Sequence, residues 1–125
     1  MVTDADRMRA KDAVGRYGEQ VAARYLQSMG LTLLDRNWRC RDGEIDIVAR
    51  EDELVVICEV NTRRGLDFGA PIEAVTPAKA RRLRTLGLRW LAEHEQPYTP
   101  LRFDVVSVVA NPSGAAAVEH LRAAF

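Results

Sequence analysis

The sequence contains 125 residues, 47% of them hydrophobic, and its 18 basic side chains balance 18 acidic ones. This length suits one domain with a genuine hydrophobic core and leaves no room for a second domain. Because the net charge is zero, attraction to nucleic acid or to a membrane cannot come from overall charge and must come from local clusters. We expect a single domain over residues 1–125, in which residues 1–12 could form a disordered or frayed segment.

The cysteines and histidines do not indicate a structural metal site. Cys40, Cys58, His94 and His120 lack the spacing of zinc ligands, and two thiols in a domain of this size fit a reducing cytoplasm better than a disulfide framework. The first fifteen residues, MVTDADRMRAKDAVG, are too charged for a signal peptide. No apolar run approaches the roughly 18 residues that a membrane span needs. We therefore expect a cytoplasmic protein without a membrane partner.

The first expected element is a helix that ends at Met29 and is followed by Gly30 as a C-terminal stop. Apolar residues recur along it with the period of an α-helix. Glu19 lies at the edge of this apolar stripe, and two interpretations stay open for it. It is either a boundary glutamate that reaches into solvent, which is the commoner case, or a carboxylate that points along the core margin towards a sheet.

Three strands are expected next, over residues 31–38, 43–49 and 54–63, with a turn at Asp42-Gly43. Side chains alternate between the two faces of a strand. One face of the second and third strands therefore gathers the following residues: Glu44, Asp46, Val48, Val55, Ile57, Glu59, Asn61 and Arg63. If residues 50–53 form a four-residue loop, Glu44 lies opposite Glu59, and Asp46 is a diagonal neighbour of Glu59 at roughly 7–8 Å.

Acidic residues placed in this way call for a positive partner. Glu44 directly across from Glu59 would be destabilising unless a metal ion or an arginine intervenes. Asp46 and Glu59 are close enough to share one divalent cation, and sites built from carboxylate oxygens alone suit Mg²⁺ above all. A metal held in this way can stabilise the attacking and leaving oxygens of a phosphodiester displacement. The strand pair therefore predicts a metal site of the phosphodiesterase type.

Basic residues gather at two places around this strand pair. Thr76 can cap a second helix that begins at Pro77, and four basic residues follow at its start: Lys79, Arg81, Arg82 and Arg84. Cations beside the free N–H groups of a helix start can bind phosphate, although charges on an exposed helix face usually serve only solvation. Around Trp38, three arginines suit a phosphodiester backbone but are a weak signal alone: Arg36, Arg39 and Arg41.

The last third of the chain is expected to contain a strand over residues 101–109. It carries Asp104, which is more readily explained as the partner of an arginine such as Arg63 than as a metal ligand. The tail over residues 114–125 is helical by its alanine content. Residues 118–122 could instead form an edge strand.

Four segments carry a resemblance to a known family. GRYGEQVAARYL, RNWRCRDGEIDIVA, EVNTRRG and RFDVV, in this order, resemble the YraN-like family of small bacterial proteins, which are predicted endonucleases related to Holliday-junction resolvases. The resemblance implies a restriction-endonuclease-like α/β fold, with a central mixed sheet of four or five strands flanked by two main helices. It also implies a PD-(D/E)-x-K active site, and it makes the tail a final strand rather than a helix.

Carried over to this sequence, the resemblance implies Asp46 as the metal-binding aspartate, Glu59 as the acid of the E-x-K element and Glu19 as an accessory acid. The implied cofactor is Mg²⁺ or Mn²⁺, and the implied partner is branched or structured DNA. The residues expected to contact the nucleic acid are Arg39, Arg41, Arg63, Lys79, Arg81, Arg82 and Arg84. A resolvase that acts on a two-fold junction suggests a homodimer, which is an analogy.

The sequence departs from the family pattern at one position. Where the pattern is E-V-K-T-R, the chain has Asn61 in place of the lysine. Asparagine can hydrogen-bond a water but supplies no charge, and losing one preorganised contact of this kind commonly costs about 10²–10³ in rate. Arg63, about 6.6 Å further along the same side of the strand, or Lys79, reaching in from the second helix, could replace the lysine.

Three functions therefore stay open. The first is a Mg²⁺- or Mn²⁺-dependent endonuclease for branched DNA. The second is a nucleic-acid-binding protein on a nuclease fold, with little or no cleavage because of Asn61. The third, and weakest, is a protein-interaction module with no nucleic-acid role.

Overall fold

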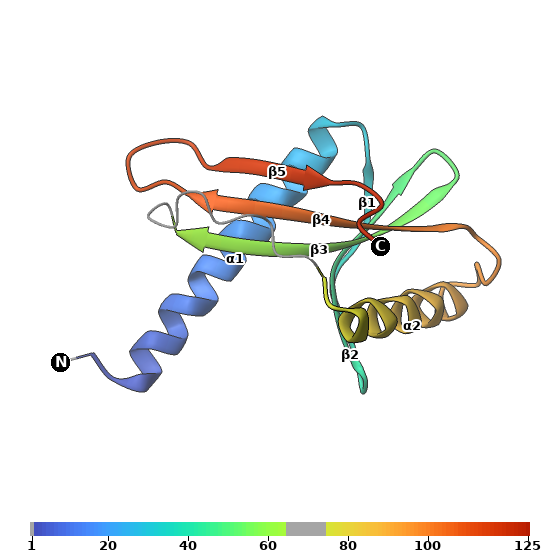
Figure 1. The fold of residues 1–125 in the computed structure, drawn as a ribbon, viewed down its shortest axis with the longest axis horizontal. Helices are drawn as coiled ribbons and strands as arrows, with labels where there is room; N and C mark the ends of the chain where they lie inside the picture. Colours follow the sequence, from blue (N-terminus) through green and yellow to red (C-terminus); the bar gives the residue numbers. More distant parts are fainter. Residues whose placement is uncertain (1, 65–74) are drawn as a thin grey trace.

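The structure is a computed structural model that describes residues 2–64 and 75–125. In these ranges the elements follow one another as α1 (Asp4–Ser28), β1 (Thr32–Cys40), β2 (Gly43–Glu51), β3 (Leu54–Arg64), α2 (Pro77–Glu93), β4 (Leu101–Ala110) and β5 (Ala117–Leu121) (Figure 1). The strands form one sheet of order β1-β2-β3-β4-β5, in which β3 and β4 are parallel and all other neighbours antiparallel. The expected α/β fold with a mixed sheet is confirmed, and it is consistent with a restriction-endonuclease-like fold.

Both helices begin where local chemistry favours it. Thr3 caps α1, because its side-chain oxygen accepts a hydrogen bond from the Asp6 N–H while the Asp6 carboxylate accepts one from the Thr3 N–H. Thr76 caps α2 with Pro77 at the first position, as predicted. No helix within residues 2–64 and 75–125 has the length and the apolar character needed to cross a bilayer.

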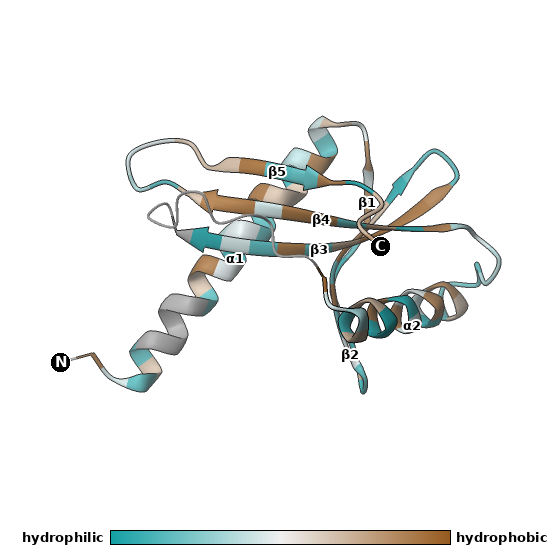
Figure 2. Ribbon diagram, in the orientation of Figure 1, coloured by the Kyte–Doolittle hydropathy of each residue, from teal (hydrophilic) through white to brown (hydrophobic). Residues whose placement is uncertain are grey.

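The sheet is covered by one helix on each face, and a separate hydrophobic cluster fills each interface. The cluster on the α1 side contains Ala22, Ala23, Leu26, Leu31, Ile47, Ala49, Val56, Cys58, Val106 and Val108. The cluster on the α2 side contains Ile45, Val48, Val55, Ile57, Leu83, Leu86, Trp90, Leu91 and Phe103. The alternation predicted for β3 is confirmed, since successive residues of this strand belong to the two clusters in turn. The polar residues of β3 follow at its carboxyl end, where the ribbon changes from hydrophobic to hydrophilic (Figure 2).

The register between β2 and β3 differs from the predicted one by two residues. Glu51 pairs with Leu54 and Ile47 with Cys58, so the turn consists of Asp52 and Glu53 instead of four residues. Asp52 has a φ of 53°, a left-handed conformation that tight hairpin turns require and aspartate tolerates. A shift of two residues leaves the predicted faces unchanged along the paired stretch from Ile47 to Cys58. The predicted position of Glu44 opposite Glu59 is therefore wrong, because this register places Asp46 level with Glu59, just beyond the pair Ile47 and Cys58.

The two strands separate beyond the pair Ile47 and Cys58. From there back to its start, β2 pairs with β1 alone, and two-stranded ribbons twist more than wide sheets. This explains why Ile45, predicted to share a face with Ile47, lies in the α2 cluster. The carboxylate of Asp46 fills the gap in the ladder, because its Oδ2 accepts a hydrogen bond from the Val60 N–H at 2.8 Å.

The C-terminal segment is an edge strand. Its alanine content predicts a helix, and that prediction is wrong, whereas the edge strand that the resemblance favours is confirmed as β5, which pairs with β4. Tertiary context outweighs helix propensity here, since Val118 packs against the α1 cluster and β4 would otherwise leave an unpaired edge.

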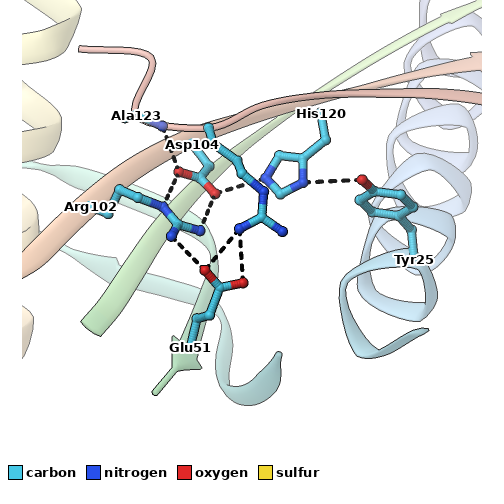
Figure 3. Close-up of polar contacts among 7 residues, drawn as sticks. Tyr25, Glu51, Arg102, Asp104, His120 and Ala123 are labelled. Carbon is cyan, nitrogen blue, oxygen red and sulfur yellow. Dashed lines mark hydrogen bonds and ion pairs between the residues drawn. The ribbon is translucent and has the colours of Figure 1, made fainter. Parts of the chain in front are cut away.

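Asp104 lies in a buried polar network and not at the acidic face (Figure 3). The arginine that holds it is Arg102, through two hydrogen bonds of 2.9 Å, and not Arg63, which donates to Ser107 Oγ at 3.2 Å. His120 Nε2 lies 2.7 Å from Asp104 Oδ2, and His120 Nδ1 lies 3.2 Å from the Tyr25 hydroxyl. The network therefore ties β4, β5 and α1 together.

We expect Asp104→Asn to lower the free energy of unfolding at pH 7 by about 3–5 kcal/mol, because it leaves buried cationic and polar groups without their carboxylate. Burial alone would raise the pKa of Asp104, but hydrogen bonds from Arg102, the Ala123 N–H and His120 hold it below its ordinary value. Because folding lowers the pKa of Asp104, its ionised carboxylate stabilises the folded state at any pH above the ordinary pKa of 3.8. This stabilisation is lost as the pH falls through the lower pKa of the folded state. Urea denaturation should therefore show the difference from the parent shrinking in acid, while Asp52→Asn in the exposed turn leaves stability unchanged.

Candidate functional site

An acidic cleft opens between the β2–β3 pair and the first turns of α2. It encloses about 310 Å³ and is lined by Gly43, Glu44, Asp46, Glu59, Lys79, Arg82, Leu83 and Leu86. The separation of β2 from β3 opens this space, and two leucines of α2 that belong to the buried cluster on this side of the sheet also line it. The cleft thus combines three carboxylates with two cations from the helix.

Asp46 is the electrostatic centre of the cleft. Burial raises the pKa of Asp46 to about 7, the hydrogen bond from the Val60 N–H opposes this rise, and the negative charges of Glu59, Glu19 and Glu44 add to it. Three glutamates from α1, β2 and β3 therefore act on one carboxylate. A buried acid surrounded by other acids is the kind of site that gains most from a bound cation.

Glu59 is held by a cation from the opposite element. Its side chain is 15% exposed, and Lys79 Nζ lies 2.5 Å from its Oε1. Lys79 is fixed by the start of α2, where its own N–H donates to the Thr76 side chain at 3.1 Å. Glu44 has a different partner, Arg39, whose Nε lies 3.1 Å from Glu44 Oε2 across the β1–β2 pair. Glu44 and Glu59 therefore do not share one positive partner, as the predicted register required, and each has a separate cation.

Glu19 is brought towards the sheet by a close helix contact. α1 crosses β3 at Gly18, where a Cβ atom would lie only 1.8 Å from the Thr62 side-chain oxygen. Glu19, the next residue, is partly buried, lines a groove together with Arg39 and Glu44 and raises the pKa of Asp46. Glu19 therefore lies close enough to Asp46 to act on its charge, which favours the second of the two interpretations of the sequence.

Asn61 and Arg63 continue β3 beyond Glu59. Asn61 is partly buried and lies level with Ser107 of β4. The hydrogen bond from Arg63 to Ser107 Oγ directs that guanidinium over β4. Of the two cations that could replace a lysine at position 61, Lys79 is the one that contacts Glu59.

The basic residues predicted to bind nucleic acid fall into two groups. Lys79 and Arg82 line the cleft, and Arg39 lies at its rim. Arg41, Arg81 and Arg84 are exposed, and the Arg84 guanidinium also lies 5.6 Å from the centre of the Phe125 ring. The sequence pointed to these residues but not to Gly18, whose only signal is the spacing G-x-x-G-E.

The residues of the cleft fit a partly hydrated cation better than a fully enclosed one. Within the described ranges, no group of three or more histidine, cysteine, aspartate or glutamate side chains is placed to hold a metal ion. Asp46 and Glu59 follow a common strand pair, and Mg²⁺ typically takes one or two carboxylates, several waters and substrate phosphate oxygens. The two acids match that donor set, whereas zinc would require more protein ligands.

Fold and cleft together define a small α/β protein with a mixed five-stranded sheet and an acidic cleft beside its second helix. The chain belongs to the uncharacterised protein family UPF0102, whose model matches residues 18–108. It is 56% identical over 118 residues to the UPF0102 protein of Frankia alni, covering 94% of this chain and 98% of that protein. The counterpart from Beutenbergia cavernae is 57% identical over 115 residues, covering 92% and 98%. The resemblance drawn from the sequence is thus confirmed at the level of the family.

Proposed function

We propose that this protein is a Mg²⁺- or Mn²⁺-dependent endonuclease of the PD-(D/E)-x-K type that cleaves branched or structured DNA in the cytoplasm. The observation that carries the proposal is the position of Asp46 and Glu59 in one cleft, level with each other at the point where β2 leaves β3. Two carboxylates in this arrangement, with cations from α2 opposite, match what a metal-assisted phosphodiester hydrolysis requires.

Each residue of the cleft has a role in this proposal. Asp46 and Glu59 would hold the metal ion, which supplies Lewis-acid polarisation of the phosphate when bound. Glu19 adds negative potential from α1, as its effect on the pKa of Asp46 indicates. Arg82 from the cleft and Arg39 from its rim would orient the phosphodiester backbone, since arginine binds phosphate oxygens in a bidentate manner.

The activity is tested with a panel of four-way junction, flapped and linear DNAs, incubated with the purified protein and Mg²⁺ or Mn²⁺. The proposal predicts metal-dependent cleavage, faster on branched than on linear DNA and abolished by a chelator. No cleavage of any DNA in Mn²⁺ by highly purified protein would exclude the enzyme.

Sedimentation of the active protein tests the accompanying proposal that it acts as a homodimer on two-fold junctions.

The rate of cleavage should depend on pH through Asp46. A metal ligand must be deprotonated, and the pKa of Asp46 is raised to about 7. We expect single-turnover cleavage, at a fixed Mn²⁺ concentration well below saturation, to rise about tenfold per pH unit below 7 and to level off above it, because metal binding then competes with the proton on Asp46. A flat profile between pH 5.5 and 8 would contradict the assignment of Asp46 as a ligand.

A second candidate function rests on Asn61, which supplies no charge at the position of the motif lysine. In this alternative the protein binds nucleic acid on a nuclease fold and cleaves little or nothing. The two functions share a DNA-binding surface and are separated by the cleavage panel.

Neutralising the basic residues of α2 should weaken DNA binding under either function. For Arg81→Gln, Arg82→Gln and Arg84→Gln combined, we expect a loss of affinity of about tenfold or more at low salt and a shallower dependence on salt, because fewer counterions are released. Fluorescence anisotropy at several salt concentrations measures both quantities. The matched change Arg24→Gln, on the exposed side of α1, serves as the control, and affinity unchanged in the triple variant would argue against this surface.

A further inference from the structure

We propose that Lys79 supplies, from the start of α2, the positive charge that Asn61 does not supply from β3. The inference rests on the proposed function and assigns to one side chain a role in the same cleft. It predicts an active enzyme despite the departure at position 61.

The need for such a charge follows from the order of residues on β3. Asn61 lies two residues beyond Glu59, so both side chains project from the same face of the strand. A cation at this position would stabilise the charge that develops on phosphate and on the attacking water. The asparagine amide can orient a water by hydrogen bonding, but it is neutral.

Lys79 places an ammonium group where this charge is needed. Its Nζ lies 2.5 Å from Glu59 Oε1, and the side chain lines the same cleft as Asp46. The side chain of Lys79 is 45% exposed and that of Glu59 15% exposed. The carboxylate is therefore sheltered, while the ammonium group remains within reach of a phosphate that enters from solvent.

The helix holds Lys79 in this position. The Thr76 cap and Pro77 define the start of α2, and Ala80, the next residue, is buried with Leu83 against the sheet. A rigid element preorganises a functional group better than a mobile loop does. Lys79 thus reaches Glu59 from the helix, whereas Asn61 lies two residues from Glu59 on the strand.

The type of residue agrees with this role. Of the 18 basic residues only Lys11 and Lys79 are lysines, and all the others are arginines. Lysine offers a compact charge with three donors that can contact a carboxylate and a water together. The guanidinium of Arg63 is instead directed to Ser107.

The charge of Lys79 gives the proposal a signature of opposite signs. Its ammonium group attracts Glu59 and repels a metal ion. Removal of this group therefore makes the net charge of the cleft more negative, which favours a bound cation. Lys79→Met should therefore bind Mn²⁺ as tightly as the parent or more tightly, yet cleave more slowly. An ion pair that served only the fold would not separate metal binding from cleavage in this way.

The test compares the parent with Lys79→Met, Asn61→Lys and the double variant, by single-turnover cleavage of a four-way junction and by calorimetric titration with Mn²⁺. We expect Lys79→Met to lose about 10²–10³ in rate without weaker Mn²⁺ binding. The double variant should recover most of the loss, because a lysine again stands beside Glu59. Arg24→Gln is the control for a lost surface charge and should behave as the parent.

The outcomes separate this inference from the proposed function. Cleavage by Lys79→Met at the parental rate, or a loss that Asn61→Lys does not restore, overturns the role of Lys79 and leaves the endonuclease intact. Cleavage by Asn61→Lys together with an inactive parent overturns it too, because Lys79 then fails to replace the motif lysine. If neither protein cleaves, the proposed function fails with it.

Discussion

Replacing Asp46 by asparagine is expected to abolish DNA cleavage and, at pH 8, to make the protein more stable. Asparagine keeps an oxygen that can accept the hydrogen bond from the Val60 N–H, so the end of the β2–β3 ladder is preserved. It removes the negative charge that a metal ion requires, and a fall in rate of at least about 10³ is expected.

The gain in stability follows from the sign of the pKa shift. Burial, together with the charges of Glu59, Glu19 and Glu44, raises the pKa of Asp46 from 3.8 to about 7. Because folding raises the pKa of Asp46, the folded state is favoured when this carboxyl is protonated. The resulting stabilisation is fully present below the ordinary pKa and is lost as the pH rises through about 7. The asparagine variant avoids this loss and should exceed the parent by about 2–4 kcal/mol at pH 8, at 1.36 kcal/mol per pKa unit.

Thermal and urea denaturation of both proteins at pH 5 and pH 8, without metal, measures the difference. The advantage of the variant should grow with pH, and Glu53→Gln in the exposed turn should show no such dependence. An inactive variant that is also less stable at pH 8 would mean that Asp46 supports the fold, and the loss of cleavage would then say nothing about metal binding.

Replacing Gly18 by alanine is expected to be among the most destabilising single changes in the described part of the chain. A Cβ atom there would lie 1.8 Å from the side-chain oxygen of Thr62 and 2.7 Å from its Cβ. Thr62 is β-branched and cannot swing away freely, so α1 must move off β3. We expect a loss of about 3–5 kcal/mol in the free energy of unfolding.

Gly15→Ala on the same helix is the matched control. A Cβ atom at Gly15 meets nothing within 4 Å, so only helix propensity changes, and a gain of up to about 1 kcal/mol is expected. Thr62→Ala should recover part of the loss in the Gly18→Ala background, which a double-mutant cycle would show. Equal effects of the two glycine changes would contradict the close contact between α1 and β3.

The faces of the strands could be predicted from sequence because burial imposes a period of two. Val55, Ile57 and Glu59 share a face under the predicted register and under the observed one, since a shift of two residues changes no face. For the same reason the pattern could not fix the register. The charged run over residues 50–53 is compatible with a loop of two or of four residues, and only the structure selects the shorter turn.

Contacts between elements that are distant in the sequence could not be predicted from the sequence pattern. The ion pair between Lys79 and Glu59 depends on where α2 crosses the sheet, which packing decides and local pattern does not. The predicted partner of Asp104, Arg63, lies on β3. The observed partner is Arg102, which lies two residues away on β4 and can fold back onto the carboxylate. The C-terminal strand followed from the family resemblance, because alanine content alone favours a helix.

The proposal that Asp46 and Glu59 form a metal site is tested most directly by paramagnetic broadening of amide resonances in isotope-labelled protein. Mn²⁺ added below stoichiometry should first broaden the amides of Asp46, Glu59 and Val60, and this selective effect should disappear in Asp46→Asn. Broadening that begins at other acidic residues, or that persists unchanged in the variant, would contradict the account.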